Sequence, residues 1–412
     1  MARRRHTVAR HAHLRSPHPL AQFGVMLVVA VAVAVVSAGG VAAFASYDLV
    51  ESFSSGAVEI EGQPPVPPDI GAIEGGVNVL VTGIDQCEEE FKHYFGARCK
   101  GPDAAGKLND VNLLVHISDK PRRVTVISFP RDLMVQLPSC TRPDGSRTGG
   151  GRDAINAAYT YGGLSCVVKT VSQLSGLNIH FAAMVTFGGV IEITDAIGGV
   201  DVCLQDPIRD RNTGLNMEPG THTVSGVTAL QFLRTRYGVG DGSDLGRISN
   251  QQQYMSRLAR KLMSEDVLSN PATLYKLASV ALSNVTPSTN LTNPMTVVQI
   301  ALAVKDVPFG DIVFLQYPTL GDPSNPNKVV PNLSAAADMW AALETNKRLQ
   351  ITGAVGANGA VVDVTQPSAP PAEPDPAATG DAAAPPAEEV VELPKSITGS
   401  TADQQTCSAR KH

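Results

Sequence analysis

Short apolar runs alternate with stretches of helical periodicity through the middle of this 412-residue chain. Residues 77–82, 111–117 and 124–129 are rich in Val, Leu and Ile, a composition typical of buried strands. Ser118-Asp119-Lys120-Pro121 forms a turn signal between the second and third runs, which favours two hairpin-linked strands. The alternation predicts an α/β fold, with a mixed β-sheet covered by helices on both faces in three α-β-α layers.

Glycines mark the expected ends of several helices, because glycine readily takes the left-handed position that follows a helix. Predicted helices cover 154–161, ending at Gly162-Gly163; 166–174, ending at Gly176; 190–197, ending at Gly198-Gly199; and 226–233, capped by Ser225. Further strands are expected at 181–187 and 200–204.

The amino terminus has the pattern of a membrane anchor. Residues 1–19 carry five arginines and no acidic residue, and residues 20–45 contain no charged side chain. About 20 apolar residues span a bilayer, and a basic flank stays cytoplasmic. The alternative is a cleaved signal peptide ending near Ala43-Phe44-Ala45, but the apolar stretch is longer than a usual signal core. We expect a single-pass plasma membrane protein whose bulk is extracytoplasmic.

Composition divides the exported part into four segments. Residues 46–74 include Pro64-Pro65-Val66-Pro67-Pro68, which predicts a stiff extended stalk. Residues 75–265 hold the alternating strands and helices, and 266–352 read as a helical and strand accessory segment packed on them. From 353 to 412 the chain is rich in Ala and Pro and poor in large apolar groups, which predicts a disordered tail.

Six cysteines suit an oxidising compartment, where they allow 15 disulfide pairings. Cys87 with Cys99 is the first expected pair, because they bracket a short polar excursion, and Cys140 with Cys166 is the second. Cys203 and Cys407 stay unassigned. A zinc site is disfavoured by the absence of any Cys-x-x-Cys motif. The net charge of -6 argues against a nucleic-acid partner.

Arginines stand where predicted elements end, in a pattern that suits a phosphate ligand. Arg131 follows the run 124–129 after Pro130, at a strand end where α/β folds bind ligands. Arg234 and Arg236 are one residue apart and would share one side of an extended segment. Arg247 and Gln251 are four apart on a helix face. Guanidinium groups match phosphate oxygens in pairs, although any single arginine is more simply a solvated or salt-bridged side chain.

Two carboxylates stand at the ends of strand-like runs, as the arginines do. Asp85 follows the run 77–82, and Asp110 precedes the run 111–117. Each has a simple alternative role, Asp85 in a turn after Gly83 and Asp110 as a strand-entry cap. Together with a phosphate ligand they indicate a Mg²⁺ site, because Mg²⁺ prefers carboxylate and phosphate oxygens.

Several ordered blocks of sequence resemble the LytR-CpsA-Psr family of envelope proteins, in its actinobacterial form. The blocks are Asn78-Val79-Leu80-Val81-Thr82-Gly83-Ile84-Asp85, Ser128-Phe129-Pro130-Arg131-Asp132, Ile155-Asn156-Ala157-Ala158-Tyr159, Asp195-Ala196-Ile197-Gly198-Gly199-Val200-Asp201-Val202, Ala229-Leu230-Gln231-Phe232-Leu233-Arg234-Thr235-Arg236 and Asp244-Leu245-Gly246-Arg247 through Gln251-Gln252.

The resemblance implies a phosphotransferase that moves a glycopolymer from a polyprenyl-pyrophosphate carrier onto peptidoglycan, with 75–265 as its catalytic domain. It places Mg²⁺ on Asp85 and Asp110, and the pyrophosphate on Arg131, Arg234, Arg236, Arg247 and Gln251. Where the family has Arg-x-Asp, this chain has Leu108-Asn109-Asp110, and Lys107 is the expected substitute. Arg152 stands near Ala154, where many members carry a lysine, and Asn250 replaces a frequent arginine.

Two other functions are compatible with the same residues. A hydrolase would cleave polyprenyl pyrophosphate without an acceptor. A scaffold or regulator would bind the lipid-linked glycan without turnover. The presence of both carboxylates beside the cations favours the transferase, because binding alone does not require them.

Overall fold

A computed structural model describes residues 50–51, 53–95, 99–100, 107–142, 144–264, 267, 270–365 and 389–411. The predicted anchor at 20–45 lies outside these ranges. Within them, no helix has both the length and the apolar character needed to cross a bilayer.

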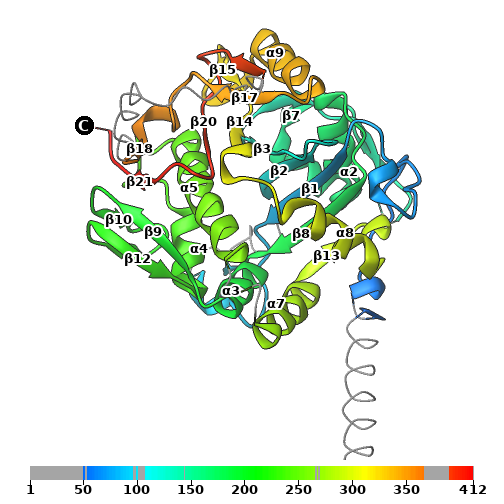
Figure 1. Cartoon of the computed structure of the whole chain (residues 1–412), viewed down its shortest axis with the longest axis horizontal. Coiled ribbons are helices and arrows are strands. Elements are labelled where there is room, and N and C mark those ends of the chain that lie inside the picture. Colours follow the sequence, from blue (N-terminus) through cyan, green and yellow to red (C-terminus); the bar gives the residue numbers. More distant parts are fainter. Residues whose placement is uncertain are drawn as a thin grey trace, which may run out of the picture. The chain divides into compact units, whose positions relative to one another are not determined.

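Seven of the described strands form a central mixed sheet (Figure 1). In spatial order they are β13 (Val285–Pro287), β8 (Phe181–Thr186), β1 (Val77–Ile84), β2 (Asn109–Ile117), β3 (Val124–Phe129), β14 (Ile312–Gln316) and β20 (Gly399–Thr401). β1 runs parallel to β8, and β3 runs parallel to β14. β1, β2 and β3 are antiparallel neighbours, as the turn between the last two predicted.

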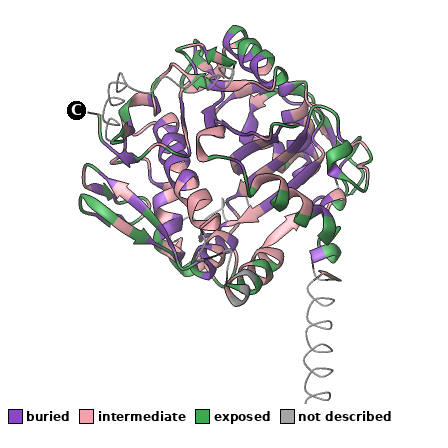
Figure 2. Ribbon diagram, in the orientation of Figure 1, coloured by how far each residue is buried: buried purple, intermediate pink, exposed green. Residues whose placement is uncertain are grey.

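Both faces of this sheet are buried, which confirms the predicted layering (Figure 2). Side chains alternate along β1, so that Leu80 and Ile84 enter one core while Val77, Val79 and Val81 enter the other. The first core is closed by α2 (Ala158–Ser175) and α9 (Leu333–Glu344). The second is closed by α8 (Pro294–Val304) and part of α5 (Asp244–Leu262).

A smaller sheet packs beside α5, with the order β12 (Gly220–Val224), β9 (Val200–Leu204), β21 (Thr406–Ser408) and β18 (Val361–Asp363). The other long helices are α3 (Phe187–Ala196), α4 (Gly226–Arg234) and α7 (Pro271–Asn284). Five two-stranded pairs complete the described strands: β4 (Met134–Gln136) with β7 (Arg152–Ala154), β5 (Ser139–Thr141) with β6 (Arg147–Gly149), β10 (Ile208–Asp210) with β11 (Leu215–Met217), β15 (Thr319–Asp322) with β16 (Asn325–Pro331), and β17 (Arg348–Ile351) with β19 (Val390–Leu393).

The two helices predicted at 154–161 and 166–174 are one kinked helix, α2. Gly162 and Gly163 leave helical geometry, with Gly163 at a φ of 63°, but the chain resumes the helix immediately. A Cβ at Gly162 would lie 2.8 Å from the Cβ of Cys140, so this position also needs the small residue for packing. Gly176 ends α2 at a φ of 73°, as predicted.

Part of the predicted stalk packs on the fold instead of extending from it. Ile60 is buried in the first core, and Ile70 and Ile73 are buried in the second. The Gln63 Nε2 donates to the backbone oxygens of Ile179 and His180, at 3.2 and 2.9 Å. The extended-stalk prediction was wrong here because isolated isoleucines among the prolines find apolar partners on the sheet.

The boundaries predicted at 266–352 and 353–412 also needed correction. β14 comes from the supposed accessory segment, yet it is a fully buried strand inside the central sheet. β18, β19, β20 and β21 come from the supposed disordered tail. The Ala- and Pro-rich stretch at 366–388 lies outside the described residues. Composition misled here because the flanking strands are three or four residues long and are held by backbone pairing rather than by long apolar runs.

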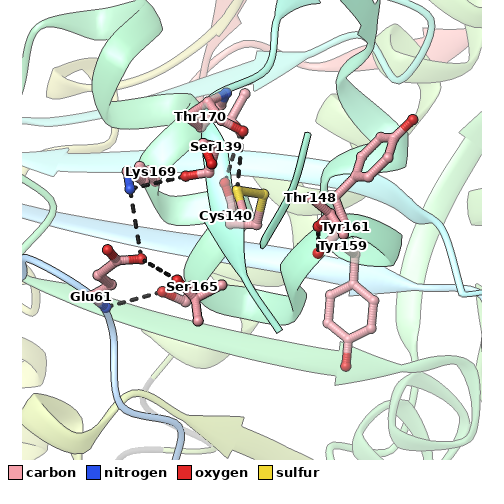
Figure 3. Close-up of a disulfide and its surroundings, with 12 residues drawn as sticks. Glu61, Ser139, Cys140, Thr148, Tyr159, Tyr161, Ser165, Lys169 and Thr170 are labelled. Carbon is pink, nitrogen blue, oxygen red and sulfur yellow. Dashed lines mark hydrogen bonds and ion pairs between the residues drawn. A yellow bond between two sulfur atoms is a disulfide. The ribbon is translucent and has the colours of Figure 1, made fainter. Parts of the chain in front are cut away.

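Three disulfides are present, and they include both predicted pairs, Cys87–Cys99 and Cys140–Cys166. Figure 3 shows how the second ties β5 to α2. Nearby, Lys169 Nζ donates to the Ser139 carbonyl at 3.1 Å and pairs with Glu61 Oε2 at 3.6 Å. The third disulfide joins Cys203 on β9 to Cys407 on β21 across a sequence separation of 204.

Candidate active site

A β-bulge sets the position of Asp110, at the end of the sheet where β1 stops and β2 begins. Gly83 of β1 pairs with Val111 of β2, but the next residue, Ile84, pairs with Asn109, so the ladder skips Asp110. A bulge of this kind leaves the extra residue unpaired and redirects its side chain. The carboxylate of Asp110 is thereby available to residues beyond the sheet.

Arg131 forms an ion pair with this carboxylate. Its Nη1 lies 2.8 Å from Asp110 Oδ2, and its Nε lies 3.4 Å from Asp244 Oδ1 and 3.6 Å from Asp132 Oδ2. Burial lowers the pKa of Arg131, but Asp110, Asp244 and Asp132 outweigh burial and raise it above its usual value. The guanidinium is therefore fixed in place and remains charged.

Arg247 enters the same cluster from the first turn of α5. Its Nη2 is 2.7 Å from Asp244 Oδ1 and donates to the Asp110 carbonyl at 3.2 Å. Only 5% of Arg247 is exposed, and this burial lowers its pKa although Asp244 acts in the opposite direction. Asp244 also stands at the positive end of the α5 dipole, which favours its negative charge.

Asp210 holds the backbone of the segment 235–237, which includes Arg236. Asp210 Oδ2 accepts from Thr235 Oγ1 at 2.8 Å, from the Arg236 backbone N–H at 3.0 Å and from the Tyr237 backbone N–H at 3.2 Å. Burial raises the pKa of Asp210, but these hydrogen bonds outweigh it and lower the pKa below its usual value. Asp210 thus fixes the Thr235 side chain between the two arginines in sequence.

Arg234 differs from prediction in its backbone, because it is the last residue of α4 rather than part of an extended segment. Its guanidinium carbon lies 4.6 Å from the ring centre of Phe187 and 5.6 Å from that of Phe95. Both distances are within the range of cation–π attraction. The two rings therefore orient Arg234 at an apolar border.

Six of the sequence-predicted residues meet at one cavity of about 230 Å³. It is lined by Asp110, Arg131, Arg234, Arg236, Arg247 and Gln251, together with Val111, Phe187, Asp210, Asn212, Thr213, Leu233 and Tyr237. Four guanidinium groups, from the segment after β3, from α4, from the loop after α4 and from α5, thus surround a space large enough for a small anion.

Two of these guanidinium groups have an unused donor. The Nε atoms of Arg236 and Arg247 are buried and have no hydrogen-bond acceptor among the described residues, whereas the buried Arg131 Nε lies 3.4 Å from Asp244 Oδ1. Buried donors are normally satisfied, so two orphaned N–H groups at one cavity indicate a place for an external acceptor. An anion with several oxygens meets this requirement.

Gln251 and Asn250 hold α5 against α4. Gln251 Nε2 donates to the Leu233 carbonyl at 2.8 Å, and Asn250 Nδ2 donates to the Phe232 carbonyl at 2.9 Å. Asn250 Oδ1 accepts from the Ser408 hydroxyl of β21. In the described structure Asn250 is therefore a structural link to the carboxyl-terminal segment, which accounts for an amide where an arginine was expected.

Three predicted site residues are not brought to the cavity. Asp85 is buried, and its Oδ1 accepts from the Leu108 backbone N–H at 2.8 Å. Lys107 has an exposed side chain, and only its carbonyl is engaged, by Thr160 Oγ1 at 2.8 Å. Arg152 pairs with Asp322 of β15 at 2.6 Å. Hydrogen bonds from Ser324, with a smaller contribution from Arg152, lower the pKa of Asp322 to about 2.

The residues present fit Mg²⁺ in part. Asp110 Oδ1 is buried and has no hydrogen-bond donor among the described residues, so this oxygen is available to bind a cation. No group of three His, Cys, Asp or Glu side chains suited to a metal occurs in the described residues. Mg²⁺ is often held by one or two carboxylates plus substrate phosphates, so such an ion would depend on the substrate for its other ligands.

The carboxyl-terminal segment supports the arginine-bearing loop. Gly240, four residues after Arg236, accepts from the Lys411 N–H at 3.0 Å and donates to the Ala409 carbonyl at 2.8 Å. The Cys203–Cys407 disulfide lies in the same segment. Sequence reasoning missed this support, as it missed Asp210 and Asp244. Asp244 alone had a local signal, since it is three residues before Arg247 at the start of a helix.

The sequence profile of the LytR_cpsA_psr family matches residues 49–345. The probable cell wall biosynthesis protein LcpB of Corynebacterium glutamicum is 30% identical over 211 residues, 51% of this chain and 48% of LcpB. LcpA of the same organism, a cell wall biosynthesis protein, is 26% identical over 65% of this chain and 55% of LcpA. The chain thus spans about half the length of these two relatives.

Two further comparisons concern a named transferase and the fold. The polyisoprenyl-teichoic acid–peptidoglycan teichoic acid transferase TagT of Bacillus subtilis is 27% identical over 58% of this chain and 69% of TagT. A solved LytR-Csp2A-Psr enzyme from Actinomyces oris has a TM-score of 0.52 and 24% identity, covering 70% of this chain and 95% of that one. The structural likeness supports the mixed α/β fold.

Proposed function

This chain belongs to the LytR_cpsA_psr family, and on that premise we propose that it transfers a glycopolymer from a polyprenyl-pyrophosphate carrier onto peptidoglycan, leaving a phosphodiester link. The observation that carries the proposal is the cavity lined by four arginines, in which the Nε–H donors of Arg236 and Arg247 have no acceptor among the described residues. A pyrophosphate supplies acceptor oxygens for both donors. The transferase name of TagT supports the reaction class.

The reaction is a displacement at phosphorus. The acceptor hydroxyl oxygen forms a bond to the glycan-bearing phosphorus, the bond from that phosphorus to the bridging oxygen breaks, and polyprenyl phosphate leaves with the electron pair. The hydroxyl proton passes to water. Arg131, Arg236 and Arg247 stabilise the charge that grows on the phosphate oxygens, an effect of about 3 kcal/mol for a well-placed donor.

Preorganisation accounts for much of this effect. Arg131 and Arg247 are already fixed by Asp110 and Asp244, and the Arg236 backbone is fixed by Asp210. These side chains need little rearrangement when the substrate binds, so binding energy is available for the transition state.

Mg²⁺ is part of the proposal. Asp110 Oδ1 would hold the ion beside the substrate oxygens. Asp85 is the second candidate carboxylate; it is outside the cavity lining, and its backbone N–H donates to the Leu108 carbonyl, two residues before Asp110. When bound, the ion would neutralise negative charge on the pyrophosphate.

The polyprenyl chain would leave the cavity along its apolar border. Phe187, Ile191 and Leu230 form a small core there, with Phe91 and Phe95 packed against it. The α2 face is less suitable, since Val167, Val168 and Val171 are buried in the first core. With residues 20–45 as a membrane anchor, this border would receive a lipid from the outer leaflet of the plasma membrane.

The test is a reconstituted transfer assay. The full chain is incubated with a synthetic polyprenyl-pyrophosphate oligosaccharide and peptidoglycan fragments, with and without Mg²⁺, and products are separated by mass. We expect an acceptor-dependent phosphodiester product that Arg236→Ala reduces about 10²–10³-fold. Arg211→Ala, an exposed arginine outside the cavity, is the matched control.

The other functions give different products in the same assay. Release of phosphate-ended glycan without an acceptor would identify a hydrolase. Binding of the substrate without any Mg²⁺-dependent turnover would identify a scaffold. Either outcome would overturn the proposal.

A further inference from the structure

A second polar cavity, of about 360 Å³, lies at the opposite end of the sheet from Asp110. Its walls come from the loop before β1, the last residues of β2, the loop between α2 and β8, and α9. β1 has eight residues, so the two cavities are separated by about 25 Å at roughly 3.3 Å for each residue. The volume is within the range of about 300–1,000 Å³ that is common for small-molecule sites.

Asn78 organises two histidines in the wall of this cavity. Asn78 Nδ2 donates to the Asn178 carbonyl at 2.9 Å, so its Oδ1 is the acceptor that faces His116 Nδ1 at 2.8 Å. His180 Nδ1 accepts from the Asn78 backbone N–H at 3.1 Å. Burial lowers the pKa of both histidines, and both rings are therefore neutral near pH 7.

These contacts determine the tautomers. His116 carries its proton on Nδ1, which leaves Nε2 as an acceptor. His180 accepts at Nδ1 and therefore carries its proton on Nε2, which is a donor. Neither Nε2 atom has a hydrogen bond to another described residue. The two histidines that line the cavity thus have one free donor and one free acceptor among the described residues, the combination that a hydroxyl group needs because it both donates and accepts.

Other groups in the lining extend this pattern. Asn346 Oδ1 is buried and has no hydrogen-bond donor within the described structure. Trp340 of α9, the only tryptophan of the chain, adds an aromatic surface, and the exposed Glu74 and Glu344 add acceptors at the rim. None of the residues that line the cavity is Lys or Arg, so a phosphate has no counter-charge here.

We propose that this cavity binds a neutral sugar unit, through hydroxyl hydrogen bonds to His116, His180 and Asn346 and apolar contact with Trp340. The lining also holds three carboxylates, but Glu74 and Glu344 are exposed, and Asp119 accepts from the Gly75 backbone N–H at 3.0 Å and lies 4.0 Å from Arg122 Nη1. The neutral imidazoles and amides therefore suit hydroxyl groups better than a cationic amine. The site is distinct from the arginine cavity and does not require the transfer reaction. If the proposed function is correct, the sugar would belong to a glycan strand that the protein handles.

Trp340 allows a direct binding experiment, because its fluorescence reports on this cavity alone. The full chain in detergent is titrated with chitotetraose, maltotetraose, spermidine and inorganic pyrophosphate. We expect a saturable emission change with at least one tetrasaccharide and none with spermidine or pyrophosphate. No saturable change with either tetrasaccharide up to about 10 mM, a concentration that would detect a Kd of a few millimolar, or a response to spermidine alone, would overturn the proposal.

Variants localise the binding and separate it from transfer. His180→Ala should weaken tetrasaccharide binding at least about tenfold, equivalent to the loss of one hydrogen bond of about 1.4 kcal/mol. Glu344→Ala, at an exposed helix position, should weaken it several-fold without risk to folding. Asp338→Ala, exposed on the same helix but outside this lining, should leave it unchanged.

Arg131→Ala should also leave sugar binding unchanged, so failure of the transfer assay and failure of sugar binding are separate results. Circular dichroism and the thermal midpoint show whether His180→Ala is folded. Equal affinity in folded His180→Ala and wild type would contradict the site.

Discussion

Arg131 Nη1 lies 2.8 Å from Asp110 Oδ2, although Arg131 follows β3 and Asp110 is the bulged residue of β2. The pair joins the sheet edge to the ion cluster of α5, because Arg247 donates to the Asp110 carbonyl. Asp110 Oδ1 is buried and has no hydrogen-bond donor among the described residues, and Arg131 Nε lies 3.4 Å from Asp244 Oδ1. The pair therefore both positions the arginine and offers a group to a ligand.

This coupling predicts non-additive effects on transfer. Arg131→Lys keeps the charge but loses the planar donor pair, and Asp110→Asn keeps the shape but loses the charge. Since either change disrupts the same pair, the double variant should lose less activity than the product of the single losses, with a coupling of about 1 kcal/mol or more. A double-mutant cycle on kcat/KM measures it, and strict additivity would show that the pair does not act as a unit.

Asp210 should make stability pH dependent. Its folded pKa is depressed, so its contribution is present above the unfolded value of about 3.9 and is lost as pH falls through the lower folded value. Asp210→Asn should lower the free energy of unfolding by about 2 kcal/mol near pH 7. Denaturant titrations from pH 7 to pH 3 should show the difference between variant and wild type shrinking below about pH 4. A difference that stays constant with pH would contradict this role.

The Cys203–Cys407 disulfide should support the site as well as the fold. Replacing both cysteines by serine should cost about 2–5 kcal/mol of stability. It should also lower kcat at temperatures where the variant is still folded, because β21 then holds the Gly240 loop less firmly. The matched control replaces Cys140 and Cys166, which lie on β5 and α2, outside the cavity lining. Equal losses of kcat in the two folded variants would count against a specific role.

Phe187 should orient Arg234 through its ring. Phe187→Leu keeps an apolar side chain but removes the π face that lies 4.6 Å from the guanidinium carbon. The loss of about 0.5–2 kcal/mol should appear as a 2- to 30-fold fall in kcat/KM. Phe232→Leu, in a core on the other side of α4, serves as the control for general loss of an aromatic ring. No difference between the two variants would exclude the cation–π contact as a determinant.

The sequence predicted the central strands well because their runs of Val, Leu and Ile are buried on both faces. β20 escaped prediction because Gly399-Ser400-Thr401 has no apolar pattern and is held by pairing with β14. The burial of Ile60 and Ile70 could not be predicted from the sequence either, because it depends on surfaces that only the folded sheet provides.

The site residues were also predicted only in part. The arginines were found because each stands beside an element end, and the structure brings Arg131, Arg234, Arg236 and Arg247 to one cavity. Arg152 was expected at the site because it is near Ala154 in the sequence. The structure instead pairs Arg152, on β7, with Asp322. Asp210 was missed because its partners are 25 to 27 residues away and have no fixed spacing.

The most direct test is a crystal structure of the chain with geranylgeranyl pyrophosphate and Mg²⁺. The account predicts pyrophosphate density in the arginine cavity, with phosphate oxygens within about 3.2 Å of the nitrogens of Arg131, Arg236 and Arg247. A headgroup bound elsewhere on a folded protein, with this cavity empty, would contradict it.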